Sequence, residues 1–227
     1  MEKIVVPFWK YWWSYITDVH LEMTSSDLNP QLEVLLSKGK LQLCTKNAIY
    51  SHADRYDNFK VALQEVLPQL IEQPNVLVLG LGLGSIHFML ENTFKKEAFL
   101  TAVELDEEIV RLCQEYVLHL LKRPGQIIVG DGEEFVYNCM DEFDLICMDI
   151  FEDDVIPQAF LQIEFLESLN EILLPGGWVI YNHLGNKPEE IIAGREFFDV
   201  VFSAVFEDAR IISHPTNLML AGKRRGY

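Results

Sequence analysis

The chain passes from an apolar run into alternating glycines at Asn75-Val76-Leu77-Val78-Leu79-Gly80-Leu81-Gly82-Leu83-Gly84-Ser85, and residues 86–90 continue it with helical spacing. Gly80, Gly82 and Gly84 permit a tight turn and a close approach of the backbone to a ligand. The N-terminus of the helix that follows favours polar or anionic groups. The stretch therefore predicts a strand, a glycine loop and a helix that together bind a nucleotide or a nucleoside.

A second apolar run, residues 98–103, ends at Glu104, twenty residues after Gly84. An acidic side chain at this spacing accepts hydrogen bonds from both hydroxyls of a ribose. A glycine loop alone also occurs in buried strand-to-helix turns, where glycine serves packing. The spaced acid favours the binding role, and the two features together predict an α/β protein that binds a nucleoside cofactor.

Apolar runs and amphipathic stretches alternate along the rest of the chain, which is typical of a doubly wound, mostly parallel Rossmann-like sheet. The expected strands cover residues 76–79, 99–104, 126–129, 145–149 and 178–181. The expected helices cover residues 85–94, 106–121, 132–140, 158–173 and 188–202. Pro175-Gly176-Gly177 predicts a helix stop before the fifth strand, and residues 209–213 and 217–221 predict an antiparallel hairpin at the edge of the sheet.

The first part of the chain has a different character. Residues 32–44 read as a β-hairpin around Ser37-Lys38-Gly39-Lys40, so we expect a small β-rich region over residues 1–56 and the Rossmann-like domain over residues 57–227. The segment Phe8-Trp9-Lys10-Tyr11-Trp12-Trp13-Ser14-Tyr15 is dense in aromatic residues. We expect it to form a second small core or a homodimer contact rather than a stacking platform for bases.

Charge and composition narrow the classes of partner. The 227 residues carry a formal charge of −17, which disfavours nucleic acid as a partner and could draw a cationic substrate. No apolar run reaches the ~18 residues that span a bilayer, and the N-terminus lacks the pattern of a signal peptide, so no membrane partner is expected. The four cysteines lie mostly in apolar runs without metal-ligand spacing, as in a reduced, cytoplasmic protein.

Acidic residues follow two further expected strands. Asp131, between Gly130 and Gly132, could accept a hydrogen bond from an adenine amino group or could cap the next helix. Asp149 ends the fourth strand and is followed by Glu152, Asp153 and Asp154. Crowded carboxylates raise one another's proton affinity or hold a cation such as an amine, a sulfonium or a metal.

The histidines give no support to a metal site, because none has helpful spacing relative to these acids. Only His183, after the fifth strand, is expected near the cleft. For Asp153 and Asp154, a solvated loop with a helix cap is an equally good interpretation. The site hypothesis therefore depends on Asp149, which the strand pattern places at the cleft.

These segments together resemble the spermidine-synthase-like branch of the class I S-adenosylmethionine-dependent methyltransferase superfamily, over about residues 75–182. The resemblance is carried by residues 76–85, Val103-Glu104-Leu105-Asp106, Val129-Gly130-Asp131-Gly132, residues 143–149 and Leu174-Pro175-Gly176-Gly177. It implies an adenosyl sulfonium donor, either S-adenosylmethionine or its decarboxylated form. Its site residues would be Gly80, Gly82 and Gly84 at the donor's tail, Glu104 at the ribose, and Asp131 and Gly132 at the adenine. Asp149 would both contact the donor and act with Glu152 as a catalytic acid.

The sequence also departs from the pattern of aminopropyltransferases. Leu83 stands where they carry an aspartate in the glycine loop, and Glu152 replaces the second acid of their Asp-x-x-Asp-Pro segment. Val61 and Ala62 stand where a tyrosine and a glutamine are expected. Because each lost charged hydrogen bond costs roughly 1.5–3 kcal/mol, we expect methyl transfer to a small-molecule nucleophile ahead of aminopropyl transfer to a polyamine.

Two other functions remain open at this stage. One is a nicotinamide-dependent oxidoreductase, because Gly80-x-Gly82-x-x-Ser85 nearly meets that fingerprint, although Gly130-Asp131-Gly132 and the terminal hairpin count against it. The other is a cofactor-binding protein without catalysis, which Leu83 and the changes at residues 61 and 62 keep possible.

Overall fold

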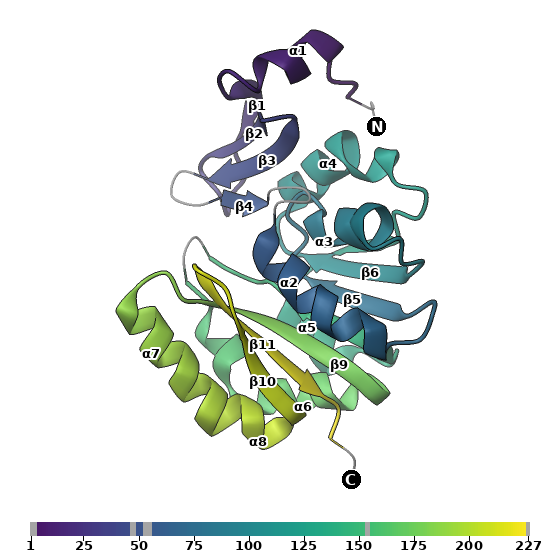
Figure 1. Ribbon diagram of the computed structural model, residues 1–227, viewed down its shortest axis with the longest axis vertical. Coiled ribbons are helices and arrows are strands. Elements are labelled where there is room, and N and C mark those ends of the chain that lie inside the picture. The colour runs from purple at the N-terminus through teal and green to yellow at the C-terminus, as the bar shows by residue number, and fades with distance from the viewer. Residues whose placement is uncertain (1–3, 46–48, 52–55, 153–154, 226–227) are drawn as a thin grey trace.

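The computed structural model describes residues 4–45, 49–51, 56–152 and 155–225. An antiparallel four-stranded sheet near the N-terminus lies beside a seven-stranded sheet with helices on both faces (Figure 1). In the part of the chain so described, no helix combines the length and the apolar character needed to cross a membrane.

The large sheet confirms the predicted doubly wound topology. Its strand order is β10-β11-β9-β8-β5-β6-β7, with parallel pairing from β7 to β9 and antiparallel pairing of β11 with β9 and with β10. The strands are β5 (Asn75–Leu79), β6 (Phe99–Glu104), β7 (Gln126–Val129), β8 (Phe143–Met148), β9 (Leu173–Leu184), β10 (Glu207–Ser213) and β11 (Asn217–Lys223). The chain runs from β5 to β6 on one side and later returns to β8 on the other, so β5 marks the switch point where such sheets bind ligands.

Helices cover both faces because the buried strands are apolar on both sides. Val76 and Val78 of β5 pack into the core under α2, α3 and α4, whereas Leu77 and Leu79 pack under α5 and α6. The helices are α2 (Asp57–Val66), α3 (Ser85–Phe88), α4 (Glu107–Tyr116), α5 (Gly132–Asn138), α6 (Ile163–Glu171), α7 (Pro188–Phe197) and α8 (Ser203–Val205). Short 3-10 or π turns lie at Leu67–Gln69, Met89–Thr93, Leu118–Leu120, Gln158–Leu161 and Phe198–Phe202.

The segment Pro175-Gly176-Gly177 lies inside β9, so its interpretation as a turn between helix and strand is wrong. β9 advances from Leu173 to Trp178 while β8 advances only from Phe143 to Leu145, which makes this segment a bulge. Gly177 fits there because a Cβ would come within 3.0 Å of the Phe143 carbonyl oxygen. β9 therefore begins before this segment, at Leu173, and the two glycines lie within the strand.

The N-terminal sheet has the order β1-β2-β3-β4 and contains the predicted hairpin. Its strands are β1 (Val19–Thr24), β2 (Leu32–Ser37), β3 (Lys40–Thr45) and β4 (Ile49–Ser51). Leu32, Val34 and Leu36 alternate inward on β2 and pack against Ile109 and Leu112 of α4 in one apolar cluster. The division at residue 56 remains a prediction.

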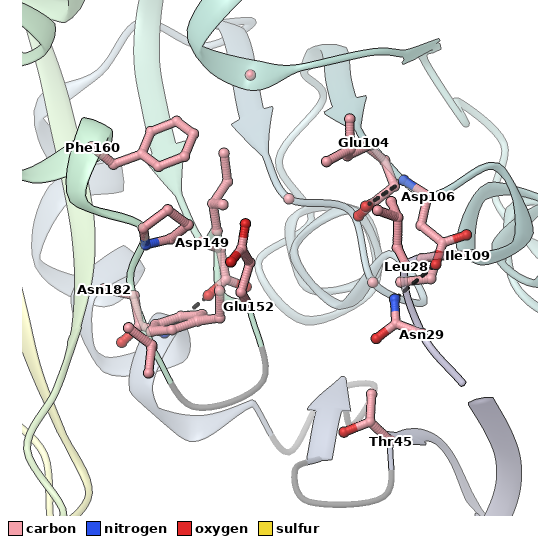
Figure 2. A pocket seen from close by; sticks show the side chains of 18 of the residues that line it. Leu28, Asn29, Thr45, Glu104, Asp106, Ile109, Asp149, Glu152, Phe160 and Asn182 are labelled. Atoms are coloured by element: carbon pink, nitrogen blue, oxygen red, sulfur yellow. Dashed lines mark hydrogen bonds between the residues drawn. The ribbon is translucent and has the colours of Figure 1, made fainter. Parts of the chain in front are cut away.

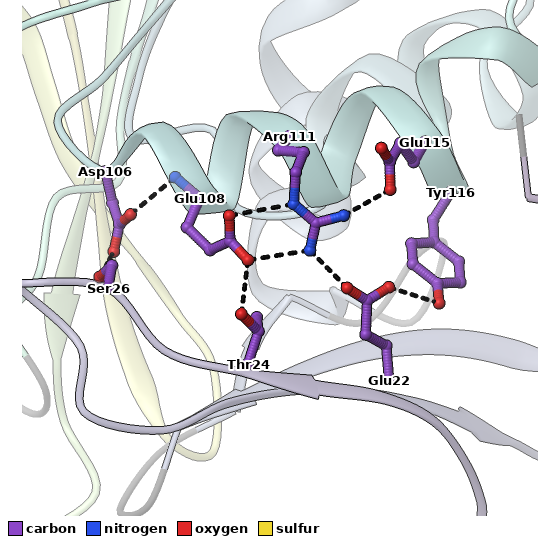
Figure 3. Close-up of polar contacts among 8 residues, drawn as sticks. All are labelled: Glu22, Thr24, Ser26, Asp106, Glu108, Arg111, Glu115 and Tyr116. Carbon is purple, nitrogen blue, oxygen red and sulfur yellow. Dashed lines mark hydrogen bonds and ion pairs between the residues drawn. The ribbon is translucent and has the colours of Figure 1, made fainter. Parts of the chain in front are cut away.

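A cluster of charged side chains also joins this sheet to α4 (Figure 3). Arg111 of α4 forms ion pairs with Glu108 and Glu115 on its own helix and with Glu22 of β1. The Tyr116 hydroxyl donates to Glu22 at 2.9 Å. One guanidinium therefore pairs with three carboxylates and reduces the repulsion among them between the two regions.

The aromatic N-terminal segment forms the short helix α1 (Phe8–Trp13), which buries none of its residues. Trp9, Trp12 and Trp13 are 58%, 67% and 54% exposed. The small core beside α4 is made mainly of aliphatic side chains from the strands and the helix, and Tyr11 packs against it. The exposed tryptophans do not build the second small core expected of this segment. The predicted homodimer contact stays a prediction.

Candidate active site

A cavity of about 1230 Å³ opens at the carboxyl ends of β5, β6, β8 and β9. Its walls combine the glycine loop, the loop after β8, residues 27–31 from the N-terminal region and the turn between β10 and β11 (Figure 2). Parallel strands whose carboxyl ends meet at one edge bring residues that are distant in sequence to the same opening. The predicted cleft therefore exists where the topology places it.

Two of the three predicted loop glycines line this cavity. Gly80 and Gly82 do so with φ of +90° and +52°, a backbone region that side chains disfavour. Gly84 lies away from the cavity lining, and a Cβ on it would meet Cys113 Sγ at 3.1 Å. Gly84, at φ +73°, precedes α3 and serves the turn itself.

Glu104 ends β6 and braces the glycine loop. Its Oε2 accepts the Leu81 N–H at 2.9 Å, and its Oε1 accepts the Asp106 N–H at 3.1 Å. Burial raises the pKa of this carboxyl, and the backbone hydrogen bonds act in the opposite direction. Each carboxylate oxygen has a second lone pair, so contact with a ribose remains compatible with this bracing and stays a prediction.

Asp131 caps α5 and also lines the cavity. Its Oδ1 accepts the N–H groups of Glu133 and Glu134 at 2.7 and 3.1 Å, which confirms the capping interpretation. The residue is exposed, and Oδ2 takes no part in the cap, so the adenine contact stays a prediction. Gly132 lines the cavity next to it. A Cβ at this position would lie 2.7 Å from the Ile150 side chain.

Asp149 lies just beyond β8 in the floor of the cavity. Its Oδ1 accepts two hydrogen bonds at 2.9 Å, from the Tyr56 hydroxyl and from the Asn182 amide. Burial raises the pKa of Asp149 to about 7; these two bonds lower it, and the nearby charge of Glu104 raises it further. A pKa in this range is the property that a general base at neutral pH requires.

Glu152 lines the same cavity as Asp149, as predicted for the pair of catalytic acids (Figure 2). Its backbone pairs with Val155 through two hydrogen bonds of 2.9 and 3.0 Å, and its side chain is exposed. Asp153 and Asp154 lie outside the described residues. The catalytic roles of Asp149 and Glu152 remain predictions.

Three polar residues near Asp149 were missed by sequence reasoning: Tyr56, Asn182 and Asn217. All three line the cavity, and the Asn217 amide donates to Asn182 Oδ1 at 2.9 Å. Asn182 carries a usable signal, because it is a polar residue at the carboxyl end of an apolar strand. Sequence reasoning selected its neighbour His183 instead.

The expectation that His183 lies at the cleft is wrong. Neighbouring residues of a strand face opposite sides, so β9 turns Asn182 to the cavity and His183 to the other face. His183 is 8% exposed, bonds the Leu184 carbonyl at 2.8 Å and packs against Phe197.

Residues 27–31 are fixed over the cavity by Asp106. This carboxylate is 3% exposed: Oδ1 caps α4 at the Glu108 N–H, and Oδ2 accepts the Ser26 hydroxyl and the Asn29 amide. The Asn29 bond is 2.7 Å long. Asp106 thus sets the wall of the cavity through the backbone that it anchors.

Three of the four positions that depart from the aminopropyltransferase pattern, all except Glu152, face apolar surroundings. Leu83 is 2% exposed and packs into the cluster formed by β2, β3 and α4, away from the large cavity. Ala62 is fully buried in the core under α2, and Val61 packs against the same core. The chain therefore presents no polar group to the cavity from these three residues.

The cavity is strongly acidic. Its described lining contains seven carboxylates and neither lysine nor arginine. The carboxylates belong to Asp27, Asp57, Glu104, Asp106, Asp131, Asp149 and Glu152. Among the described residues, no group of three or more histidine, cysteine, aspartate or glutamate side chains is arranged to hold a metal ion. The lining therefore favours organic cations over anions.

About half of the chain is similar in sequence to known proteins. A probable polyamine aminopropyl transferase of Bifidobacterium longum is 32% identical over 118 residues, which cover 51% of this chain and 25% of that protein. An eEF1A lysine and N-terminal methyltransferase homolog of Drosophila melanogaster is 29% identical over 124 residues, or 51% of this chain and 18% of that protein. The chain spans about half or less of the length of the curated relatives it matches.

Solved structures share the fold over most of the chain. The crystal structure of spermidine synthase from Thermotoga maritima has a TM-score of 0.69 at 14% identity, covering 91% of this chain and 73% of that one. Human methyltransferase-like protein 13 in complex with SAH has a TM-score of 0.59 at 20% identity, covering 74% and 82%. The sequence model of the spermine/spermidine synthase domain matches residues 66–216. The chain belongs to the spermine/spermidine synthase domain family, within the fold of the class I S-adenosylmethionine-dependent methyltransferases.

Proposed function

We propose that this chain transfers an aminopropyl group from decarboxylated S-adenosylmethionine to the amine of a polyamine. The acidic cavity is the observation that carries the proposal. The decarboxylated donor and a polyamine are both cations at neutral pH, and they match a described lining of seven carboxylates without lysine or arginine. The α-carboxylate of S-adenosylmethionine would meet no cationic side chain in that lining.

The methyl transfer expected from the sequence is unconfirmed. The family that the chain belongs to, and most of the similar proteins, favour the aminopropyl alternative, since relatives named polyamine aminopropyltransferase outnumber those named methyltransferase. The proposal therefore reverses the order in which the two activities were expected. A transferase that uses an adenosyl sulfonium donor is common to both.

The glycine loop and Glu104 would hold the donor. Gly80 and Gly82 bring bare backbone to the cavity, Glu104 would accept the ribose hydroxyls, and Asp131 would accept the adenine amino group. The bound donor supplies an electrophilic carbon next to its sulfonium, to which the amine bonds as the carbon–sulfur bond breaks and a neutral thioether leaves. The chain's contribution is to align the amine with that carbon and to exclude competing nucleophiles.

Asp149 would prepare the amine for attack. A polyamine is protonated at neutral pH, so one nitrogen must lose a proton before its lone pair is available. Asp149, with its pKa raised to about 7 by burial, would accept that proton near neutral pH. Glu152, exposed in the same cavity, would stabilise a second positive charge of the acceptor.

Methyl transfer to an amine is the second candidate, and the position of Leu83 favours it. In the family's pattern the acid of the glycine loop would recognise the donor's amine, and this chain has at that position a leucine buried away from the cavity. An enzyme without that acid depends less on decarboxylation of its donor. The same Asp149 would deprotonate the acceptor in both reactions.

The two activities are separated by their products. The purified chain is incubated with each donor and with putrescine or spermidine, and the nucleoside product is identified by mass spectrometry. Formation of 5′-methylthioadenosine from the decarboxylated donor supports aminopropyl transfer, and formation of S-adenosylhomocysteine from S-adenosylmethionine supports methyl transfer. Titration calorimetry with both donors and with NAD accompanies the assay. Binding of NAD alone would contradict both candidates, and donor binding without turnover would indicate a non-catalytic protein.

Matched variants connect the activity to the site. Asp149→Asn keeps the size of the side chain and removes the base, so we expect at least a hundredfold loss, about the contribution of general base catalysis. Asp144→Asn is the control, because Asp144 lies at the opposite end of β8 and bonds the Asn75 N–H at 2.8 Å. Equal loss in the two variants would contradict the role of Asp149.

A further inference from the structure

Tyr56 reaches the site from a position outside the motifs of the sequence. It directly precedes α2, and its ring stacks on Phe59 with centroids 5.7 Å apart and an interplanar angle of 14°. Its hydroxyl donates to Asp149 Oδ1 at 2.9 Å. Val61, where a tyrosine is expected from the family's pattern, packs on the core instead. The stacking fixes the direction of the phenol, so the hydroxyl is held at Asp149.

The second donor to the same oxygen is the Asn182 amide, which is held by a chain of hydrogen bonds that begins at Thr216. Thr216 Oγ1 donates to Asn217 Oδ1 at 2.7 Å, Asn217 Nδ2 donates to Asn182 Oδ1 at 2.9 Å, and Asn182 Nδ2 donates to Asp149 Oδ1 at 2.9 Å. An amide oxygen only accepts and an amide nitrogen only donates. Asn217 therefore determines which end of the Asn182 amide faces Asp149.

Both donors bond Oδ1, and neither bonds Oδ2. We propose that Tyr56 is a positioning residue for Asp149, which with Asn182 holds Oδ1 so that Oδ2 receives the proton of the acceptor amine. The inference rests on the proposed function and deepens it. In the step, the ammonium N–H bond breaks and its proton passes to Oδ2; the freed nitrogen pair forms the carbon–nitrogen bond, and the carbon–sulfur pair leaves with the thioether.

The charged surroundings of Asp149 set the direction of the effect. Glu104 faces it from the end of β6 and opposes its ionisation, Cys147 precedes it on β8, and Glu152 lines the same cavity. Tyr56 and Asn182 are the groups that favour the ionised form through hydrogen bonds. Loss of either donor therefore raises the pKa of Asp149.

The test compares Tyr56→Phe with Tyr116→Phe. Phenylalanine keeps the ring that stacks on Phe59 and removes only the hydroxyl. Tyr116 is a matched control because its hydroxyl also donates to a carboxylate at 2.9 Å, that of Glu22, outside the cavity. Two readouts are measured on each protein: the carboxyl pKa of Asp149 by ¹³C NMR without ligands, and the pH profile of kcat/KM with the active donor and acceptor.

For Tyr56→Phe we expect the pKa of Asp149 and the acidic limb of the profile to move up together by about one pH unit, which is about a tenfold loss at pH 6. Tyr116→Phe leaves both unchanged. Asn217→Ala frees the Asn182 amide and moves both in the same direction as Tyr56→Phe. A shift in the melting temperature of Tyr56→Phe with neither readout changed would overturn the proposal.

The two readouts keep this inference separate from the proposed function. If the NMR titration shows the shift and the wild-type chain turns over no donor, the proposed function fails and the hydrogen bond stands as a structural contact. If the enzyme is active and the limb stays fixed in Tyr56→Phe, the positioning role fails and the proposed function stands.

Discussion

The backbone of Gly80 lies directly against the backbone of Asp149. A Cβ on Gly80 would come within 2.3 Å of the Asp149 carbonyl oxygen, and the glycine has φ of +90°. The Asp149 N–H also donates to the Leu79 carbonyl at 2.8 Å. The loop proposed to hold the donor and the proposed base are therefore positioned by one contact between the ends of β5 and β8.

This contact predicts that Gly80→Ala damages both stability and binding. The methyl group forces the two backbones apart and occupies an unfavourable φ, so we expect a loss of about 2–4 kcal/mol in the free energy of unfolding and a loss of donor binding. Urea denaturation and calorimetry measure the two effects. Gly130→Ala is the stability control, since a Cβ there meets nothing within 4 Å. Equal stability of the two variants would contradict the close approach.

Glu104→Gln tests the brace of the glycine loop. The Glu104 oxygens accept backbone N–H groups from Leu81 and Asp106, and an amide nitrogen in place of one oxygen would face an N–H with another donor. We expect the affinity for the active donor to fall by about ten- to a hundredfold, the value of one lost charged hydrogen bond. Glu107→Gln, an exposed neighbour, is the control in the same calorimetric titration. Retention of wild-type affinity would exclude Glu104 from the donor site.

The topology and part of the candidate site could be predicted from the sequence because buried parallel strands are continuous apolar runs. Once Gly80, Glu104 and Asp149 are each placed at the end of such a run, the fold brings them to one edge. The glycine loop has a local signal in the alternation itself. These residues were found because their positions depend on the strands alone.

The remaining residues depend on contacts that no local pattern encodes. Tyr56 reaches Asp149 because it directly precedes α2. Asn217 reaches Asn182 because β11 pairs with β9 in an antiparallel register. The choice of His183 over Asn182 failed by one residue, since a shift of one reverses the face of a strand. The bulge in β9 likewise depends on its pairing with β8, and Pro175-Gly176-Gly177 has the same composition as a turn.

Leu83 stands where aminopropyltransferases have an aspartate in the glycine loop, and its surroundings predict the effect of placing an acid there. Because the side chain lies in the apolar cluster between β2, β3 and α4, Leu83→Asp would bury an unpaired charge there without restoring recognition of the donor. We expect a loss of at least about 3 kcal/mol in the free energy of unfolding. Leu83→Met, which conserves volume, should cost less than about 1.5 kcal/mol. A stable Leu83→Asp with tighter binding of the decarboxylated donor would show that residue 83 reaches the cavity.

Asp149 makes the stability of the chain depend on pH. Burial raises its pKa to about 7 from the ordinary value of 3.8, so between these values the folded state binds more protons than the unfolded state. The stabilising contribution of the protonated group is complete below pH 4 and is lost as the pH rises through 7. At pH 8 the folded chain holds a partly buried charge.

Asp149→Asn removes this titration while keeping the shape of the protonated side chain. We expect the difference in free energy of unfolding between Asp149→Asn and wild type to change by about 2–4 kcal/mol in favour of the variant from pH 4 to pH 8. Urea denaturation at each pH measures it. Asp149→Ala should show the same pH trend at lower stability throughout, because it removes the carboxyl together with its packing. If the difference between Asp149→Asn and wild type is constant across this range, Asp149 ionises in the folded chain as it does in the unfolded one, and it could not exchange a proton with an amine near neutral pH.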